Sequence, residues 1–576
     1  MNRTKLLIAT AALAAALLGA ERAAAQVEKQ VEVTKAYVPQ VQPAAKLPVA
    51  PDLTDTARMR PEITYTITPL ALNTPLEVQP LRPATVTYWT FNRPLPCYLK
   101  LGAGYPLRSV ADFYVATQHP DTGYALGYLN HEGYYAKIRN DFDIRNRSTQ
   151  LLNKAGAAAG KYFGSRTLEG ALSFENRLYH RYGAFTAAGR EEYYPIVPGA
   201  RINDNDAALA LRFGDDFHDL SRLNFEVSAG GDYFFDRPEG NLAGAASHQF
   251  SLQAGGRLAR TFGRHRLALE AGYERLAGSK AIAAYGEQLI RAGLRYGVEG
   301  GRAALEAGLD YVHDRMNGSE AQNYLLPVVR LQLNFGTPAI RPFLEVDGSL
   351  HDNSYRTLTR EMPYVAPALL LAKRSADYTG RLGIRGDLWR ERFTYRLYAA
   401  CAIRTNHNYW YTTGFADTDG NVLTSVTGAM FARQAEQTVV SFHGEAEFRP
   451  MSELLLELGL HGYLYHDEID FGHGEPGFRG RFGVHYTIKR VTLGLTLDGQ
   501  TRRNWTLLYT DDTGRIGQGT FRASAAMNLR FLFDWRISGR FGLFAEGDNL
   551  LNQRLYRFAG YPEYGAGFTA GIKWSF

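Results

Sequence analysis

Cysteine is scarce in this 576-residue sequence, which contains only Cys97 and Cys401. Two cysteines cannot form a disulfide framework, and structural zinc sites need about four sulfur or imidazole ligands at close spacing. We therefore interpret both as packing residues. Gly-x-Ser-x-Gly, His-Glu-x-x-His and P-loop patterns are also missing, so we expect no catalytic residue, no cofactor and no enzyme activity.

Long apolar runs are absent except at the N-terminus. The mean hydropathy of -0.28 is too polar for a bundle of membrane helices. Residues 1–25 combine a basic start at Arg3 and Lys5, an apolar run of about fifteen residues and a final trio of alanines, which is the layout of a secretory signal peptide. We expect cleavage after Ala25 and export of the remaining chain.

Clustered charge is absent too. The net charge is +6, but its carriers are spread singly along alternating segments and do not gather on one element. A nucleic-acid surface needs a basic patch or stripe. We therefore expect no nucleic-acid partner.

What the sequence does contain, over residues 96–576, is an alternation of apolar and polar residues with a period of two. Phe568, Ile572, Trp574 and Phe576 show it near the C-terminus, where small or polar residues separate them. A period of two is typical of strands with two different faces, and no helix-length pattern occurs. Residues 96–576 are therefore predicted to be all-β.

The connections between these strands indicate the architecture. Short connections such as 389–392 and 536–540 alternate with long ones such as 350–376 and 404–430. Only one rim of an outer-membrane barrel faces outward, so long loops gather there and tight turns face the periplasm. We predict a transmembrane antiparallel β-barrel of about 22 strands, within a range of about 20 to 22, in the outer membrane of a Gram-negative bacterium.

Each strand of such a barrel needs an apolar face toward lipid and a polar face toward the lumen. Leu454, Leu456, Leu458 and Leu460 supply an apolar face on one strand. On the polar faces, acids are expected on outward-running strands and arginines on returning strands, so that neighbouring strands pair opposite charges. This interpretation selects the following lumen residues: Glu270, Arg291, Arg295, Glu306, Asp310, Arg330, Arg381, Arg385, Glu546 and Asp548.

Either a plain water-filled interior or a filter selective for one sign of ion is consistent with these charges, and we favour the plain interior. Three histidines, His443, His461 and His485, are also expected on inward faces of neighbouring strands. Polar lumen residues need no special role, so we assign no metal site to them.

The connection around residue 410 is a candidate ligand loop. It joins Tyr409, Trp410 and Tyr411 to Asp417 and Asp419. Stacked aromatic rings and carboxylates suit a sugar or a calcium ion, although an Asp-Gly pair is more common as a simple turn.

A family resemblance emerges at the C-terminal end. Residues 549–552 read Asn-Leu-Leu-Asn and are followed by Tyr556, a Gly-Tyr-Pro loop at 560–562 and the aromatic Phe576. This order resembles the last two strands of TonB-dependent receptors, although Pro-Glu-Tyr replaces the usual Pro-Gly-Arg. The resemblance implies that the barrel-assembly machinery recognises the final strand through Phe576, Trp574, Ile572 and Phe568. A role of Phe576 as an interfacial aromatic is equally compatible with the sequence.

Residues 26–95 depart from that family, whose plug domain is much longer. They are rich in proline, so we expect an extended periplasmic segment. Residues 30–37 resemble the short box through which such receptors contact TonB, although any β-prone exported segment has a similar composition. The segment either fills the lumen or binds a periplasmic or outer-membrane protein, and we favour binding because its apolar residues lie singly between prolines.

Two functions from different classes follow from these patterns. In the first, a receptor-like barrel takes part in solute uptake or passage across the outer membrane. In the alternative, a barrel without a transport role anchors a protein complex through residues 26–95. An outer-membrane hydrolase would need a clustered nucleophile and base, which the sequence does not contain.

Overall fold

The computed structural model describes residues 95–117, 121–139, 145–183, 200–239, 246–371, 373–416, 423–511 and 513–576. The side chains of 416 and 423–427 are not part of that description. The expected signal peptide, nearly all of the proline-rich segment, and Asp417 and Asp419 lie outside the described residues.

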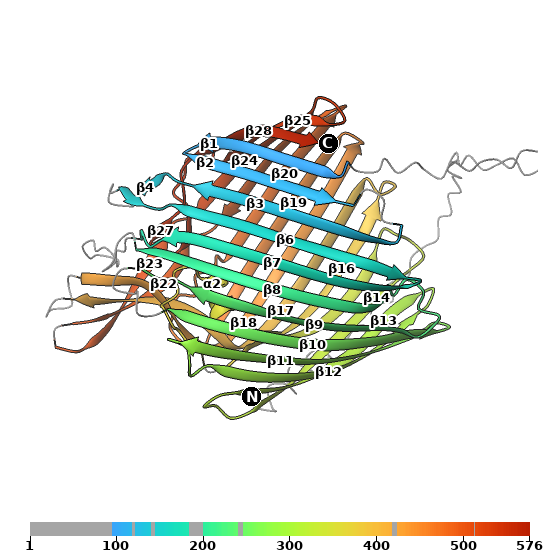
Figure 1. Ribbon diagram of the computed structural model, residues 1–576, viewed down its shortest axis with the longest axis horizontal. Helices are drawn as coiled ribbons and strands as arrows, with labels where there is room; N and C mark the ends of the chain where they lie inside the picture. The colour runs from blue at the N-terminus through green and yellow to red at the C-terminus, as the bar shows by residue number, and fades with distance from the viewer. Residues whose placement is uncertain are drawn as a thin grey trace, which may run out of the picture. The chain divides into compact units, whose positions relative to one another are not determined.

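The described part of the chain forms a closed antiparallel β-barrel of 22 strands, as predicted from the sequence (Figure 1). The first and last strands pair along their length, from Tyr98 opposite Ser575 to Tyr105 opposite Phe568, and this closes the sheet. The barrel strands are β1 (Cys97–Tyr105), β2 (Arg108–Ala116), β3 (Gly123–Tyr134), β6 (Gln150–Phe163), β7 (Arg166–His180), β8 (Arg201–Asp215), β9 (Asn224–Asp236), β10 (Ser247–Phe262), β11 (His265–Lys280), β12 (Gly286–Glu299), β13 (Ala303–Met316), β14 (Gln322–Leu333), β15 (Arg341–His351), β16 (Ser375–Leu388), β17 (Phe393–Ala416), β18 (Leu423–Met451), β19 (Leu454–Asp467), β20 (Phe478–Ile488), β21 (Val491–Gln500), β24 (Ala526–Arg536), β25 (Phe541–Asp548) and β28 (Gly567–Ser575).

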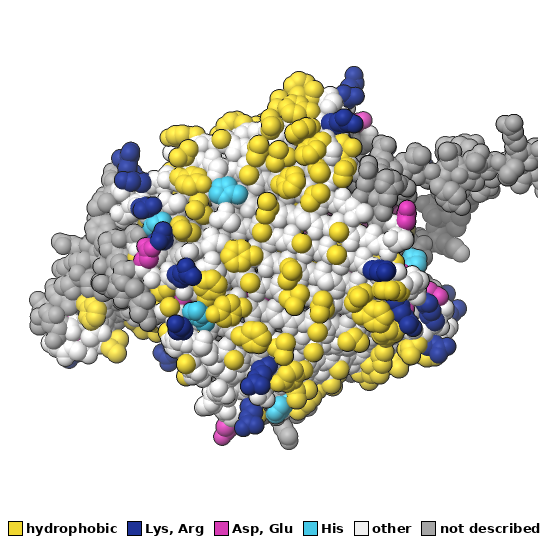
Figure 2. Space-filling view, viewed as in Figure 1, with side chains coloured by type: hydrophobic (Ala, Val, Ile, Leu, Met, Phe, Trp, Pro, Cys, Tyr) yellow, Lys and Arg dark blue, Asp and Glu magenta, His cyan; other side chains and the backbone are white. Residues whose placement is uncertain are grey.

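The outer face of the wall is apolar because the alternation holds along each strand. Leu458 and Leu460 on β19 remain 43% and 42% exposed, which suits contact with lipid. Figure 2 shows hydrophobic side chains spread over the visible wall, with Lys and Arg mainly toward its two rims. Both cysteines are free: Cys97 is half-buried, and Cys401 is exposed on the same face of β17 as Leu397.

The two rims differ as predicted. At one rim, strands are joined by very short connections such as 164–165, 263–264 and 489–490. The opposite rim carries the longer connections, although 281–285 and 317–321 are short there as well. The barrel rule assigns the first rim to the periplasm and the second, here called the outer mouth, to the outside.

The predicted loop 404–430 is mostly strand. β17 and β18 have 24 and 29 residues, whereas about 9 to 11 residues are enough to span the membrane. The excess continues past the outer mouth as a hairpin, and Tyr411–Phe415 pairs in parallel with Thr506–Thr510. Further small elements lie in the outer connections: β4 (Lys137–Arg139), β5 (Arg145–Arg147), β22 (Arg503–Thr510), β23 (Ile516–Ala523), β26 (Tyr556–Phe558), β27 (Tyr561–Pro562) and the helix α2 (Tyr355–Glu361).

The helix α2 is the one element type that the sequence pattern did not predict. It has seven residues, too few for a visible 3.6-residue period. Among the described residues, no helix is long and apolar enough to cross a membrane.

Cysteine labelling tests the assignment of the two rims. In a background with Cys97 and Cys401 replaced by serine, Arg515→Cys near the outer mouth is expected to react with a membrane-impermeant maleimide on intact cells. Gly539→Cys lies in a tight turn at the other rim, where a side chain meets open space, and is expected to react only after permeabilisation. The reverse labelling pattern would show that the two rims are assigned the wrong way round.

Candidate functional site

Opposite charges pair across the lumen wall between neighbouring strands. Arg295 on β12 contacts Asp310 on β13 through two nitrogens, at 2.7 and 2.6 Å. Arg330 on β14 lies 3.4 Å from Glu306, and Arg257 on β10 lies 3.2 Å from Glu270. Bidentate guanidinium–carboxylate contacts fix both side chains against the wall.

The other predicted lumen residues are also placed by the structure. Arg381 donates to Asp347 at 2.5 Å, Lys100 lies 3.1 Å from Glu546, and Asn528 donates to Asp548 at 3.1 Å. Arg385 donates to the Gln332 amide oxygen, so its partner is neutral. Arg291 lies on the same face of β12 as Arg295, opposite Val312 of β13 in the strand register.

A helix inside the outer mouth begins at Ser354. The Ser354 hydroxyl accepts from the Thr357 amide at 3.4 Å, and the Asp352 carboxylate accepts from the Ser354 amide at 2.8 Å and from the Thr357 hydroxyl at 2.6 Å. These contacts satisfy groups that a helix start leaves unpaired. A short helix therefore forms at a defined position in the connection 352–374 between β15 and β16.

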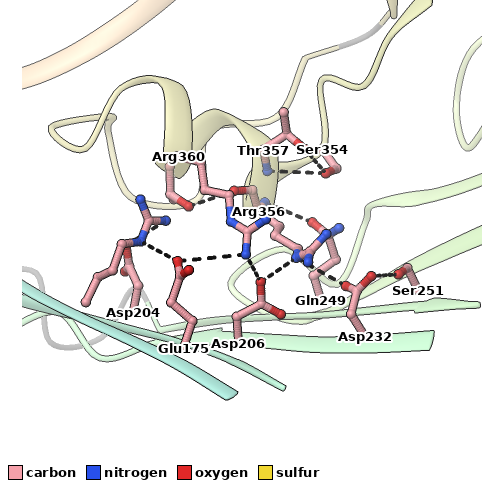
Figure 3. Close-up of polar contacts among 12 residues, drawn as sticks. Glu175, Asp204, Asp206, Asp232, Gln249, Ser251, Ser354, Arg356, Thr357 and Arg360 are labelled. Atoms are coloured by element: carbon pink, nitrogen blue, oxygen red, sulfur yellow. Dashed lines mark hydrogen bonds and ion pairs between the residues drawn. The ribbon is translucent and has the colours of Figure 1, made fainter. Parts of the chain in front are cut away.

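Two arginines of α2 point at carboxylates of the lumen wall (Figure 3). Arg356 and Arg360 are four residues apart and so lie on one helix face. Arg356 Nε is 2.8 Å from Asp206 Oδ2 and 3.4 Å from Asp232 Oδ2. Arg360 contacts the same Asp206 oxygen and lies 3.9 Å from Glu175. The acids come from β7, β8 and β9, so three strands hold the helix.

A third arginine holds the other end of the connection. Arg374 is buried and pairs with Glu287 on β12, and Glu274 on β11 lies 3.4 Å away. Burial lowers the pKa of the Arg374 guanidinium, but the charges of Glu287 and Asp352 raise it by more, so the net pKa shift is upward. Arg374 therefore stays charged, and its carboxylate partners compensate for its burial.

Between these anchors, the connection packs into an apolar cluster that we call the outer cap. It consists of the described residues of the connection 352–374 and their buried neighbours from other outer segments, including Tyr182, Met430 and Tyr561. Tyr364 stacks on Tyr561 with ring centroids 3.5 Å apart. The Ala366 amide donates to the Met430 carbonyl at 2.7 Å, which ties the connection to β18.

Polar cavities line the lumen wall. One cavity of about 800 Å³ is bordered by charged residues of β10 to β16, including Arg257, Glu270 and Arg330. Another of about 620 Å³ lies between β18, β19, β20, β21 and the connection 549–566. Within the described ranges, no three His, Cys, Asp or Glu side chains converge in a metal-binding group.

The candidate ligand loop has a packing role in the described part. Tyr409 is fully buried, and its hydroxyl donates to Asp467 at 2.8 Å. Trp410 packs against the outer cap, and the Tyr411 ring contacts Phe471 with centroids 5.7 Å apart.

The predicted histidines and the C-terminal aromatics are also located. His443 and His461 are in contact, with Nδ1 atoms 2.8 Å apart, whereas His485 lies 3.4 Å from Glu457. At the closing strand, Phe568, Trp574 and Phe576 are exposed and Ile572 is half-buried, so three aromatic rings are accessible on β28 and beside it.

The residues that hold the outer cap were not predicted from the sequence. The acids Asp206 and Glu287 lie on returning strands, where the charge rule predicted arginines. Two sequence features could have indicated these contacts. One is the pair of acids on returning strands, and the other is the i, i+4 pair Arg356 and Arg360 in a connection that carries a helix-capping serine.

Comparisons with known proteins agree with the architecture. No protein-family model matches the chain, and no curated protein matches it in sequence. Among solved structures, the FrpB iron transporter from Neisseria meningitidis is 10% identical with a TM-score of 0.63, covering 84% of this chain and 82% of that one.

Two further structures show the same likeness. The copper transporter OprC is 13% identical with a TM-score of 0.60, covering 83% of this chain and 82% of that one. The ferric enterobactin receptor PfeA from Pseudomonas aeruginosa is 12% identical with a TM-score of 0.61, covering 83% and 81%. The chain therefore has the barrel fold of TonB-dependent outer-membrane receptors, and its apolar outer wall places it in the outer membrane.

Proposed function

We propose that this protein takes part in the passage or uptake of a solute across the outer membrane, and that the connection 352–374 is its gate. The contact of Arg356 and Arg360 with Asp206 inside the outer mouth carries this proposal. Ion pairs, an apolar cluster and two backbone hydrogen bonds with Met430 hold the connection, whereas continuous hydrogen-bonded ladders hold the wall. The gate can therefore leave the mouth without unfolding the barrel.

A polar lumen favours a water-soluble solute. The paired charges on the lumen wall and the two polar cavities beside it give the lumen a surface that water can hydrate. The similar solved structures include an iron transporter, a copper transporter and a ferric enterobactin receptor, so a metal complex belongs among the first solutes to test.

In this proposal, residues 26–95 act outside the lumen. A gate built from an outer connection lets the barrel close without a plug domain, which leaves the proline-rich segment free to bind a periplasmic or outer-membrane protein. TonB is one such partner, through residues 30–37. The barrel-assembly machinery is a further partner during biogenesis, through the aromatic end of β28.

Deleting residues 26–95 tests this division of roles. We expect the bilayer conductance of the purified barrel to stay nearly unchanged, because the gate remains in place, and a co-purifying envelope protein to be lost. A large rise in conductance with no partner lost would show that the segment is the plug. Deleting only residues 30–37 then tests TonB, since a TonB-coupled receptor would lose energised uptake and keep its other partners.

A further inference from the structure

The cavity of about 620 Å³ has an unusual set of arginines at its outer end. Arg479 lies at the start of β20, Arg503 at the start of β22 and Arg557 in β26, and all three line the cavity. In the strand register Arg479 is opposite Gln500 and His461, near the outer end of β20, and Arg503 and Arg557 belong to the outer connections.

Arg503 is buried without a carboxylate partner. Arg503 is 9% exposed. Its described contacts are neutral: the guanidinium donates to the Arg557 carbonyl oxygen at 3.5 Å and lies 4.8 Å from the centroid of the Trp505 ring. Burial and the nearby Arg479 charge lower the pKa of Arg503 to about 10. A buried guanidinium that lacks a counter-charge is costly, and a bound anion would remove most of that cost.

Several other charges in the cavity already have partners. Arg481 is 2.6 Å from Asp498, and Glu457 lies 3.4 Å from His485. Glu447 is 3.5 Å from Arg449. Among the described ion pairs of the cavity wall, none involves Arg479, Arg503 or Arg557.

One carboxylate of the cavity acts electrostatically on two of these arginines, Arg503 and Arg557. Glu563 lines the same cavity and acts electrostatically on Arg503, although no ion pair within 4.0 Å joins them. Three guanidinium groups and one carboxylate leave an excess of positive charge at this end of the cavity. Glu445 lines the cavity as well, on the face of β18 that carries Glu447.

We propose that the outer end of this cavity is a binding site for the anionic group of a small solute, a carboxylate or a phosphate, held by Arg479, Arg503 and Arg557. This inference rests on the proposed function, because it names the class of solute that the lumen receives. Planar guanidinium groups bind both kinds of anion with paired N–H donors.

The site also touches the gate. Arg557 and Glu563 belong to the connection 549–566, which carries Tyr561, and Tyr561 stacks on Tyr364 of the outer cap. Tyr556, beside Arg557, also packs on the apolar cluster of the cap. An anion bound by Arg557 and Arg503 would therefore fix the segment against which the gate packs.

Calorimetric titration of the full chain in detergent, with succinate and inorganic phosphate at constant ionic strength, tests the site. We expect saturable binding of at least one anion, weakened at least tenfold by Arg503→Gln and by Arg479→Gln. Arg481→Gln is the matched control: it removes a paired arginine of the same cavity and is expected to change Kd less than twofold. If Arg503→Gln fails to fold, the Kd values of Arg479→Gln and Arg557→Gln test the site instead, because both of these arginines are exposed.

Absence of saturable binding for both anions would overturn the proposal, and so would equal weakening by Arg481→Gln. The proposed function fails separately. If a barrel without its gate does not conduct while anion binding persists, solute passage is wrong and the site stands. If that barrel conducts and the anions do not bind, the site is wrong and solute passage stands.

Discussion

Replacing Arg356 and Arg360 together by glutamine is expected to turn a mostly silent barrel into a conducting one. In the closed arrangement, Asp206 and Asp232 would then be buried under the helix without their cations. Removing one side of a buried ion pair costs about 3 to 5 kcal/mol, because the remaining charge is left uncompensated. Opening the gate hydrates those carboxylates. The free-energy cost therefore applies to the closed state alone and shifts the equilibrium toward the open state.

That free energy corresponds to a shift of about two to four orders of magnitude in the gating equilibrium. Single-channel recording in planar bilayers measures the open fraction directly. A variant with residues 355–371 replaced by a Gly-Ser linker gives the upper limit, since a lumen enclosed by 22 strands is too wide for side chains to fill.

Arg330→Gln is the control for charge loss in the lumen. Arg330 is exposed within the wall and lies outside the gate contacts, so its ion pair contributes at most about 1 kcal/mol. The open fraction of the Arg330→Gln variant is expected to match that of the wild type. If the Arg356/Arg360 double variant stays as silent as the wild type, α2 is not the gate.

Placing an arginine at Leu458 is expected to destabilise the barrel by about 2 to 4 kcal/mol, because the charge would face the hydrocarbon near mid-bilayer. Leu458 is 43% exposed on the outer face of β19. The matched variant, Thr496→Arg on β21, places the charge in the lumen, where Thr496 is opposite Arg530 and Gly483. We expect Thr496→Arg to be tolerated.

Urea unfolding of both variants in lipid vesicles, followed by tryptophan fluorescence, gives the comparison. A clear loss for Leu458→Arg with little change for Thr496→Arg agrees with the described faces. Equal losses would contradict them, because a register slip of one residue exchanges the lipid and lumen faces of a strand.

The sequence by itself determined the barrel. An alternating strand allows one apolar and one polar face, and this local rule holds at Leu458 and Leu460 without reference to any distant residue. The connection lengths determined the topology in the same way, because 389–392 is too short to do anything except turn the chain. Strand number and rim polarity follow from such local facts.

The strand faces also follow from local pattern, but their pairing needs neighbours. Arg295 and Asp310 could be assigned to one side of the wall from alternation alone. Their bidentate contact depends on the register between β12 and β13, which places Arg295 opposite Gly308 and Asp310 opposite Gly293. The small glycines leave the room for the two side chains to meet diagonally.

Only the tertiary structure decided which residues hold the connection 352–374 inside the outer mouth. Arg356 and Asp206 are 150 residues apart in the chain, and no periodicity links them. Asp206 and Glu287 are acids on returning strands, where arginines were predicted. The alternation of charges does not predict that their partners lie in the connection 352–374. A seven-residue helix and an apolar cluster drawn from several loops have no pattern of their own, because their stability comes from contacts that exist only once the wall has closed.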